Sequence, residues 1–436
     1  MRDGGRLAAA IAVLEDMEAR HKPVRLALKT WGEGARYAGA RDRAFVSGLV
    51  LDVLRKRRSL AWRMEDETWR AGVLAAVHLA WDWPLERVAV AASEDHGPGA
   101  LTPAEIARLE IPLSLDDAPA AVRGGYPDWL APHMDRAYGA EAAAEGEALC
   151  ERAPVDIRVN TLLTDPERTL KALAPLGAAP LDALATALRV AAPRADARAP
   201  PVEALPEFAK GWFEVQDVGS QIAASAAGDI KGKQVLDFCA GGGGKTLALA
   251  AAMANKGQLY AYDSDARRLT DTVTRSQRAG VRNLQIRSPI RPGALDGLDG
   301  KMDLVFVDAP CTGSGTWRRH PDAKWRLTPV QLEKRMAEQN EVLRAASAFV
   351  KPGGRIVYVT CSLLMEENED RIAAFLADHR DFAQTSTVDA IGTSGHVTPE
   401  GLAALTDHAT PEGALRLSPL TAGTDGFFVA VLERRP

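Results

Sequence analysis

Residues 235–246 read VLDFCAGGGGKT, an apolar run followed by four glycines and then by Lys245 and Thr246. The apolar run predicts a strand, and the alanine-rich residues after the glycines predict a helix. Glycines at such a turn let a ligand approach the backbone closely, beside the positive end of the helix. This stretch therefore predicts a strand, a ligand-binding loop and a helix in that order.

The alternation of strand and helix continues on both sides of this stretch. Strand-like runs stand at residues 257–265, 283–288, 302–310, 354–362 and 424–434, and helix-like runs at 266–280, 328–350 and 365–379. Strands that alternate with helices are typical of a parallel, doubly wound sheet. We therefore expect an α/β catalytic domain over residues 216–436.

Two further domains are expected before the sheet. Residues 1–145 have apolar residues at helical spacing in 6–19, 42–62 and 67–81, without strand-like alternation, which predicts an all-helical domain. Residues 146–215 combine a β-branched run with a helix-like run and an Ala- and Pro-rich stretch. They predict a small α/β linker subdomain.

The composition is that of an ordinary globular protein of 436 residues. No apolar run reaches the roughly 18 to 20 residues that a membrane helix needs, and charge comes too early for a signal peptide. The four cysteines are widely spaced without a CxxC pair, which argues against a zinc site or a disulfide framework. We therefore expect a cytoplasmic protein without a metal.

The net charge of -5 argues mildly against a dedicated nucleic-acid binder, although a local basic surface remains possible. Basic residues cluster at 55–58 and within 318–326. For a single cluster a solvated face is the better interpretation.

Asp263 ends the strand-like run after the glycine loop. An acid about twenty residues beyond such a loop suits a ribose diol. The alternative is that Asp263 caps the next helix, for which Asp265 is better placed. A phosphate loop is a weak interpretation, because Cys239 or Ala240 stands where its first glycine should be. The loop and Asp263 favour an adenosine-type cofactor, and both a nicotinamide cofactor and S-adenosylmethionine fit.

The next strand ends help to choose between these cofactors. DAPC at 308–311 and TCS at 360–362 put an acid and two thiols at the edge where open α/β sheets bind ligands. Hydride transfer does not need two cysteines, and GxGxxG is missing after the first strand. Methyl transfer to carbon 5 of a pyrimidine needs a thiolate that adds to carbon 6 and an acid beside the ring nitrogen.

The chain resembles the RNA (cytosine-5) methyltransferases, and among them the bacterial RsmB group, which modifies small-subunit ribosomal RNA. The similar segments are residues 37–62, 157–162, 213–221, 238–246, 303–326, 357–369 and 416–434. Each segment alone is a weak signal, but together and in this order they are specific. The resemblance implies a Rossmann-like methyltransferase domain behind a NusB-like RNA-binding domain.

The resemblance also implies S-adenosylmethionine as cofactor and 16S ribosomal RNA as partner. From the sequence no membrane association is expected, and no obligate protein partner is evident. It makes Cys361 the nucleophile, Cys311 the residue that assists product release, and Asp308 the acid. Cofactor-binding residues are implied at Ala240, Gly241, Gly242, Gly243, Gly244, Lys245, Thr246, Asp263, Arg268 and Asp308. Lys245 is also a candidate source of the positive charge that favours a thiolate.

Several alternatives stay open at this point. The thiol roles could be reversed, because DNA cytosine-5 methyltransferases attack with a Pro-Cys cysteine, like Cys311 here. The target could be another RNA such as tRNA, or the chain could be a catalytically silent assembly factor. Two departures from the family stand at Gly242, where a proline is usual, and at Arg287 and Ser288, where an acid usually meets the adenine. For RNA we expect a basic path from Arg318, Arg319 and residues 55–58.

Overall fold

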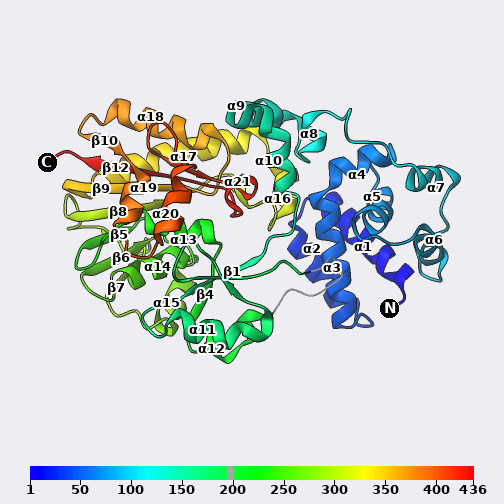
Figure 1. The fold of residues 1–436 in the computed structure, drawn as a ribbon, viewed down its shortest axis with the longest axis horizontal. Helices are drawn as coiled ribbons and strands as arrows, with labels where there is room; N and C mark the ends of the chain where they lie inside the picture. Colours follow the sequence, from blue (N-terminus) through cyan, green and yellow to red (C-terminus); the bar gives the residue numbers. More distant parts are fainter. Residues whose placement is uncertain (194–200) are drawn as a thin grey trace. The chain divides into compact units, whose positions relative to one another are not determined.

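The computed structural model describes residues 1–193 and 201–436. Part of the Ala- and Pro-rich stretch expected in the linker, residues 194–200, lies outside the described residues. The chain forms two compact units (Figure 1). Unit 1 is built chiefly from Met1–Ala153 and Thr316–Leu327, and unit 2 from Pro154–Ala191, residues 201–315 and Thr328–Pro436. The domain boundaries near residues 145 and 215 stay predictions.

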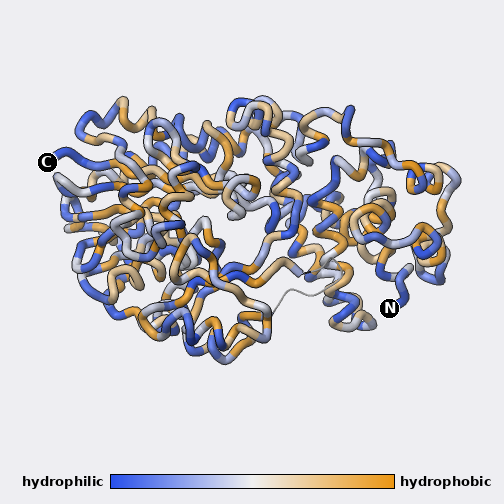
Figure 2. Tube along the Cα trace, in the orientation of Figure 1, coloured by the Kyte–Doolittle hydropathy of each residue, from blue (hydrophilic) through white to orange (hydrophobic). Residues whose placement is uncertain are grey.

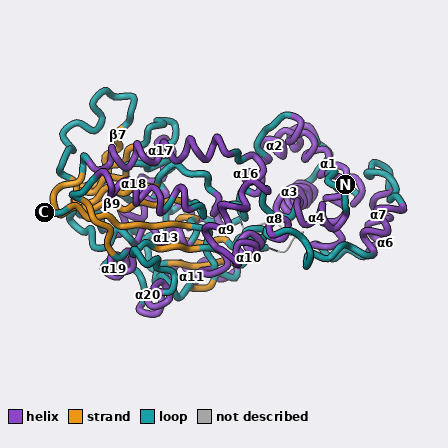
Figure 3. The backbone as a smooth tube through the Cα atoms, turned by 90° about the horizontal axis from the view of Figure 1, so that it is seen from above, coloured by secondary structure: helices purple, strands orange, loops and turns teal. Residues whose placement is uncertain are grey.

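Unit 1 is drawn as helix and loop throughout its described part in Figure 3. Its helices are α1 (Asp3–Ala19), α2 (Val24–Gly34), α3 (Ala40–Arg55), α4 (Arg57–Met64), α5 (Trp69–Ala75), the π-turn η1 (Ala76–Ala80), α6 (Leu85–Ser93), α7 (Pro103–Glu110), α8 (Ala120–Arg123), η2 (Asp128–Leu130), α9 (Ala131–Tyr138), η3 (Gly139–Glu141), α10 (Ala142–Ala148) and α16 (Pro321–Arg326). The helical N-terminal region is therefore confirmed. The expected helix at 42–62 is divided near Lys56 into α3 and α4.

The core of unit 1 follows the helical spacing of its apolar residues. Leu7, Leu14, Leu49 and Leu74, from α1, α3 and α5, are buried in one cluster. In Figure 2 hydrophobic and hydrophilic segments alternate along these helices, as expected where one face of each helix packs inward. Trp325, from the distant α16, also packs against this cluster.

Unit 2 begins with a small sheet whose strand order is β2-β3-β1-β4, all antiparallel. Its elements are β1 (Val155–Val159), α11 (Pro166–Leu173), η4 (Ala174–Leu176), β2 (Ala179–Pro180), β3 (Ala187–Val190), η5 (Val202–Ala204), α12 (Pro206–Ala209) and β4 (Phe213–Val215). Ile157, Leu173 and Phe213 are buried between the sheet and α11. This is the small α/β element expected from the sequence.

The larger sheet of unit 2 has the strand order β10-β12-β9-β8-β5-β6-β7, and β11 pairs with β12. Its elements are α13 (Val218–Ser225), β5 (Gln234–Asp237), α14 (Gly244–Ala252), β6 (Gln258–Tyr262), α15 (Leu269–Arg278), β7 (Leu284–Arg287), β8 (Met302–Asp308), η6 (Ser314–Thr316), α17 (Pro329–Ser347), β9 (Val350–Thr360), η7 (Met365–Glu367), α18 (Glu369–Asp378), β10 (Phe382–Thr385), α19 (Thr387–Gly392), α20 (Pro399–Thr406), β11 (Leu415–Leu417), α21 (Pro419–Ala422) and β12 (Phe427–Arg434). Strands β5 to β9 are parallel, which confirms the doubly wound, Rossmann-like sheet.

Helices cover both faces of this sheet. Alternate strand residues belong to two different buried clusters, with Val305 on one face and Leu304 on the other. Helices α17 and α18 contribute Leu343 and Phe375 to the first face, and α13 and α14 contribute Ile222 and Leu249 to the second. Because both faces are buried, the strands are nearly continuous apolar runs, as the sequence indicated.

The sheet has its switch point between β5 and β8. From β5 the chain adds β6 and β7 on one side and then returns to add β8 and β9 on the other. Open α/β sheets bind ligands at the carboxyl ends of the strands beside such a point. The loops after β5, β6, β8 and β9 therefore meet at one edge.

Candidate active site

The two strand-end cysteines lie side by side in unit 2. Cys311 follows β8, Cys361 follows β9, and these strands are parallel neighbours, with Asp308 opposite Val359. Their two sulfur atoms are 3.4 Å apart, and both cysteines are free thiols. The sequence placed both thiols at one edge of the sheet, and the structure brings them into direct contact.

The carboxylate of Glu367 holds the residues that follow the two cysteines. It accepts hydrogen bonds from Thr312 N and Oγ1 at 2.8 and 2.5 Å, and another from the Ser362 hydroxyl. Gln339 Nε2 donates a fourth at 3.0 Å. Burial raises the pKa of Glu367, although these hydrogen bonds oppose the shift. One buried carboxyl group thus sets the spacing of both thiol loops.

Lys245, from the glycine loop, meets Asp308 at the end of β8. Its Nζ donates to Asp308 Oδ2 at 2.8 Å, and its side chain is 11% exposed. Burial lowers the pKa of Lys245, but Asp308 and the nearby Cys361 outweigh this effect and raise it. Lys245 is therefore an ammonium ion with an electrostatic interaction with Cys361, and its expected effect on that thiol stays a prediction.

The two thiols do not have the same environment. The hydrogen bond with Cys361 is the first cause that raises the pKa of Cys311 well above its usual value, and burial and the charge of Glu367 add to it. A thiol with a strongly raised pKa stays protonated at neutral pH. Cys311 is thus suited to donate a hydrogen bond to Cys361.

The glycine loop and Asp263 also come together. Gly241 and Gly243 have φ values of +51° and +84°, and a Cβ on Gly243 would come within 2.8 Å of Thr272 Oγ1. Gly241 N donates to Asp263 Oδ2 at 2.9 Å, and Arg268 pairs with the same carboxylate at 3.3 Å. Asp263 therefore anchors the loop, and its predicted contact with a ribose stays a prediction.

Asp237, at the end of β5, was not anticipated from the sequence. It is completely buried and accepts a hydrogen bond from Thr246 Oγ1 at 2.6 Å, while Oδ1 has no partner among the described residues. Burial raises its pKa to about 7. An unpartnered carboxyl oxygen beside a glycine loop fits a ligand with an ammonium group, such as the amino-acid end of S-adenosylmethionine. The signal in the sequence was a single acid inside an apolar strand.

The expected basic path is wrong for two of its members. Arg55 and Arg318 are only 7% and 5% exposed, because α3 turns Arg55 inward onto Asp52 and onto the Arg318 carbonyl oxygen. The three other basic residues of 55–58 each pair with an acid: Lys56 with Glu151, Arg57 with Glu18 and Arg58 with Asp128. Much of this positive charge is therefore neutralised within unit 1.

Two searches of the described residues bear on other kinds of site. Within residues 1–193 and 201–436, no group of three or more His, Cys, Asp or Glu side chains could hold a metal ion. In the same part of the chain, no helix is both long and apolar enough to cross a membrane.

Comparison with known proteins agrees with this geometry. Residues 228–433 match the family model described as 16S rRNA methyltransferase RsmB/F, and residues 126–195 match the ferredoxin-like domain of the RsmF/B-like methyltransferases. A solved structure titled PH0851 shares the fold, with a TM-score of 0.73 and 24% identity over 100% of this chain and 99% of that one.

Two curated relatives extend the match. The probable ribosomal RNA small subunit methyltransferase B of Synechocystis is 32% identical over 71% of this chain and 67% of its own length. The ribosomal RNA small subunit methyltransferase B of an Enterobacter strain is 37% identical over 62% of each chain. This chain thus matches about two thirds of the length of these relatives. The resemblance seen in the motifs is confirmed: the chain belongs to the RsmB/F family of 16S rRNA methyltransferases, whose methyl donor is S-adenosylmethionine.

Proposed function

We propose that this protein methylates carbon 5 of a cytosine in 16S ribosomal RNA, through a covalent bond between Cys361 and carbon 6. The observation that carries the proposal is the 3.4 Å separation of the Cys311 and Cys361 sulfur atoms at the ligand-binding edge of the sheet. Two adjacent thiols suit a reaction in which a sulfur atom must first add to a ring and later leave it. An enzyme with this substrate works in the cytoplasm.

The first step is the addition of the Cys361 thiolate to carbon 6. The S–C6 bond forms, and the electron pair of the C5–C6 double bond is delocalised from carbon 5 toward the ring nitrogen N3. A proton from the Asp308–Lys245 pair, whose Oδ2 and Nζ atoms are 2.8 Å apart, neutralises the ring nitrogen N3. The Lys245 ammonium also interacts electrostatically with Cys361, beside the sulfur that forms the new bond.

Methyl transfer and release complete the reaction. S-adenosylmethionine supplies the methyl group as an electrophile, which the electron-rich carbon 5 accepts. The proton on carbon 5 then passes to solvent, its electron pair restores the C5–C6 double bond, the S–C6 bond breaks, and the sulfur of Cys361 leaves with the electron pair of that bond. N3 returns its proton to the Asp308–Lys245 pair, and the demethylated cofactor is S-adenosylhomocysteine. Cys311, whose raised pKa keeps it protonated, donates a hydrogen bond to that leaving sulfur and stabilises its negative charge. This environment supports Cys361 as the attacking thiol and Cys311 as the thiol that assists release.

Trapping of the covalent intermediate tests this assignment. Cys311→Ala should attack and methylate but release slowly, and so accumulate a protein–RNA adduct that survives denaturing electrophoresis. Cys361→Ala and the double variant should form no adduct and no 5-methylcytosine. An adduct with Cys361→Ala instead would exchange the roles of the two thiols.

The RNA substrate needs a separate test. Bisulfite mapping of ribosomal RNA from cells with and without the protein should show one cytosine that loses its methyl group. A change confined to tRNA would move the activity to that substrate. No change in any RNA, together with no transfer by the purified protein, would favour a silent assembly factor.

A further inference from the structure

The carbonyl groups of the glycine loop are held by three side chains from two different elements of unit 2. Thr272 Oγ1, from α15, donates to the Gly241 carbonyl oxygen at 3.0 Å. Arg275 Nη1, also from α15, donates to that of Gly242 at 2.6 Å. Arg158 Nη1, from β1, donates to that of Gly244 at 2.8 Å. When the carbonyl groups are fixed in this way, the orientation of the peptide N–H groups between them is fixed too.

Arg275 is itself fixed by Glu214 of β4. Arg275 Nη2 lies 2.9 Å from Glu214 Oε2, and the other oxygen of that carboxylate pairs with Arg278. The Glu214 side chain is 5% exposed, so this contact is poorly screened by water. Arg278 shares the carboxylate but lies over the ring of Phe208, at 3.9 Å, and none of its hydrogen bonds in the described structure reaches the loop.

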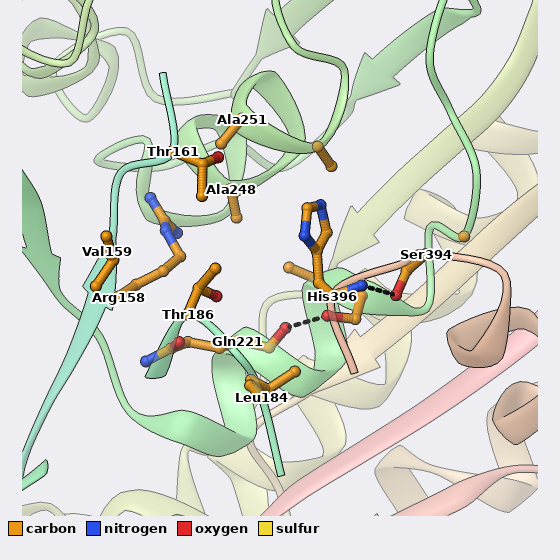
Figure 4. Close-up of a pocket in the computed structure, with 14 residues that line it drawn as sticks. Arg158, Val159, Thr161, Leu184, Thr186, Gln221, Ala248, Ala251, Ser394 and His396 are labelled. Atoms are coloured by element: carbon orange, nitrogen blue, oxygen red, sulfur yellow. Dashed lines mark hydrogen bonds between the residues drawn. The ribbon is translucent and has the colours of Figure 1, made fainter. Parts of the chain in front are cut away.

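Arg158 is held differently. It is buried and also donates to the side-chain oxygen of Gln216. On its other side is a cavity of about 40 Å³, which is also lined by Gln221 and His396 (Figure 4). Arg158 Nε and Gln221 Oε1 have no partner among the described residues, and a cavity of this size holds a water molecule. Arg158 is therefore part of the buried core, whereas Arg275, with a side chain that is 28% exposed, depends on Glu214 for its position.

Four consecutive glycines make this loop unusually costly to order. Glycine loses more conformational freedom on ordering than any other residue. Two of the four, Gly241 and Gly243, need positive φ and cannot easily be replaced. Gly242 has a negative φ, its N–H makes no backbone hydrogen bond in the described structure, and an added Cβ would meet only Arg275 Nη1, at 3.6 Å. Gly242 is thus the position at which the loop is free to move unless something outside it holds it.

We propose that Arg275, held in place by Glu214, is a positioning residue for cofactor binding. It orders the Gly242 peptide before the cofactor arrives, so that the cofactor does not have to do so. The inference rests on the methyl donor of the family and is independent of which base carbon is methylated. It predicts that the role of Arg275 can be taken over by any change that stiffens residue 242.

The test is the affinity for S-adenosylhomocysteine, measured by calorimetry on the full chain without RNA. Arg275→Gln should weaken binding about tenfold, the effect of having to order about one more residue on binding. Glu214→Gln should weaken it by a smaller factor. Arg278→Gln is the matched control, since it breaks a contact with the same carboxylate, and it should change the affinity less than about twofold. Hydrogen exchange of residues 240–246 in the apo protein should rise with Arg275→Gln and not with Arg278→Gln.

Rescue separates positioning from a merely structural role. Gly242→Pro removes the mobility of residue 242 by fixing φ, so the double variant Gly242→Pro/Arg275→Gln should regain most of the lost affinity. Arg275→Lys, which keeps the charge beside Glu214, is the second variant if Arg275→Gln does not fold, and it should lose affinity about threefold.

Three results would overturn the proposal: unchanged affinity in folded Arg275→Gln or Arg275→Lys, an equal loss with Arg278→Gln, or a double variant as weak as Arg275→Gln alone. Because RNA is absent from the assay, these results would leave the proposed cytosine chemistry untouched.

Discussion

Residues 303–315 and 316–326 are one continuous motif in the sequence, but their side chains serve two different units. The first half forms β8 and the loop of Cys311, at the ligand-binding edge of unit 2. The second half belongs to unit 1, where Trp325 Nε1 donates to the Leu54 carbonyl oxygen at 2.7 Å. Lys324 is 1% exposed there, and its Nζ lies 3.3 Å from the Arg55 carbonyl oxygen and 3.5 Å from Cys150 Sγ.

The two halves differ in what their polar groups do. Asp308 keeps 34% of its side chain exposed and Cys311 is half-buried, so both remain within reach of a substrate. Lys324 and Arg318 are buried, and Lys324 donates to the Arg55 carbonyl oxygen, so both side chains can hardly contact RNA. A motif that is read as a single functional signal can therefore combine a reactive site with part of another unit's core. Substitutions in the two halves should fail in different ways.

The largest expected effect comes from the reactive half. Cys311→Ala removes a half-buried thiol that the core does not need, so the free energy of unfolding should change by about 1 kcal/mol or less. Steady-state turnover should fall about 10³-fold or more, because release of the product is blocked. Multiple-turnover methylation assays and denaturant titrations check the two parts. A large loss of stability with normal turnover would mean that Cys311, like the residues of the second half, serves packing and not the reaction.

The second effect comes from the structural half. Trp317 is 1% exposed, and Trp317→Ala should lower the free energy of unfolding by about 3 to 5 kcal/mol through the cavity that it leaves. Trp317→Phe is the control: its ring fills most of the space, and the indole N–H that it removes has no partner in the described structure, so the cost should be about 1 kcal/mol. Equal losses in both variants would mean that packing is not what Trp317 contributes.

A third prediction compares buried charge in the two units, beginning with Asp237. Its pKa of about 7 lies well above the ordinary value of 3.8. Between these pH values the carboxyl group is protonated in the folded protein and ionised in the unfolded chain. The free energy of unfolding therefore falls as the pH rises from 3.8 to about 7. The affinity for S-adenosylhomocysteine should depend on pH in the opposite direction, because the ammonium group of this ligand needs the carboxylate form of Asp237. Affinity should therefore rise about tenfold from pH 6 to pH 8. Asp237→Asn should bind more weakly at every pH and remove this rise, and a rise that persists in the variant would exclude Asp237 as its source.

The smallest effect is expected at Lys324. Burial lowers its pKa below 10.5, although Cys150 opposes the shift. The unfolded chain thus binds the proton more strongly than the folded one, and stability should rise with pH from the lowered pKa up to 10.5. Lys324→Met keeps the length of the side chain and should change the unfolding free energy at pH 7 by about 1 kcal/mol. Denaturant titrations at pH 7 to 10 should show the rise in the wild type and a flatter profile in the variant.

Features that depend on local sequence could be predicted, and features that depend on tertiary packing could not. The strands and their common edge could be predicted, because apolar runs such as 302–307 and turns such as 241–244 depend on local composition. The proximity of Cys311 and Cys361 could be predicted too, because both residues follow strands that end at the same edge of the sheet. The burial of Lys324 could not be predicted, since a basic residue normally indicates surface, and only the packing of α16 in unit 1 reverses this. The contact of Arg275 with Gly242 could not be predicted either. It depends on which residues of α15 face the glycine loop, and no local sequence pattern shows this.

Because Thr316–Leu327 belongs to unit 1, this unit stays incomplete for part of the synthesis of the chain on the ribosome. Unit 1 begins at Met1, but its last segment emerges about 170 residues after Ala153. At about 5 to 20 residues per second, the surface that Trp325 and Lys324 cover waits roughly ten to thirty-five seconds for its final residues. During that interval the nascent helical region exposes apolar surface that the finished protein hides, so a chaperone that holds such surfaces would find its substrate here before residue 327 is made.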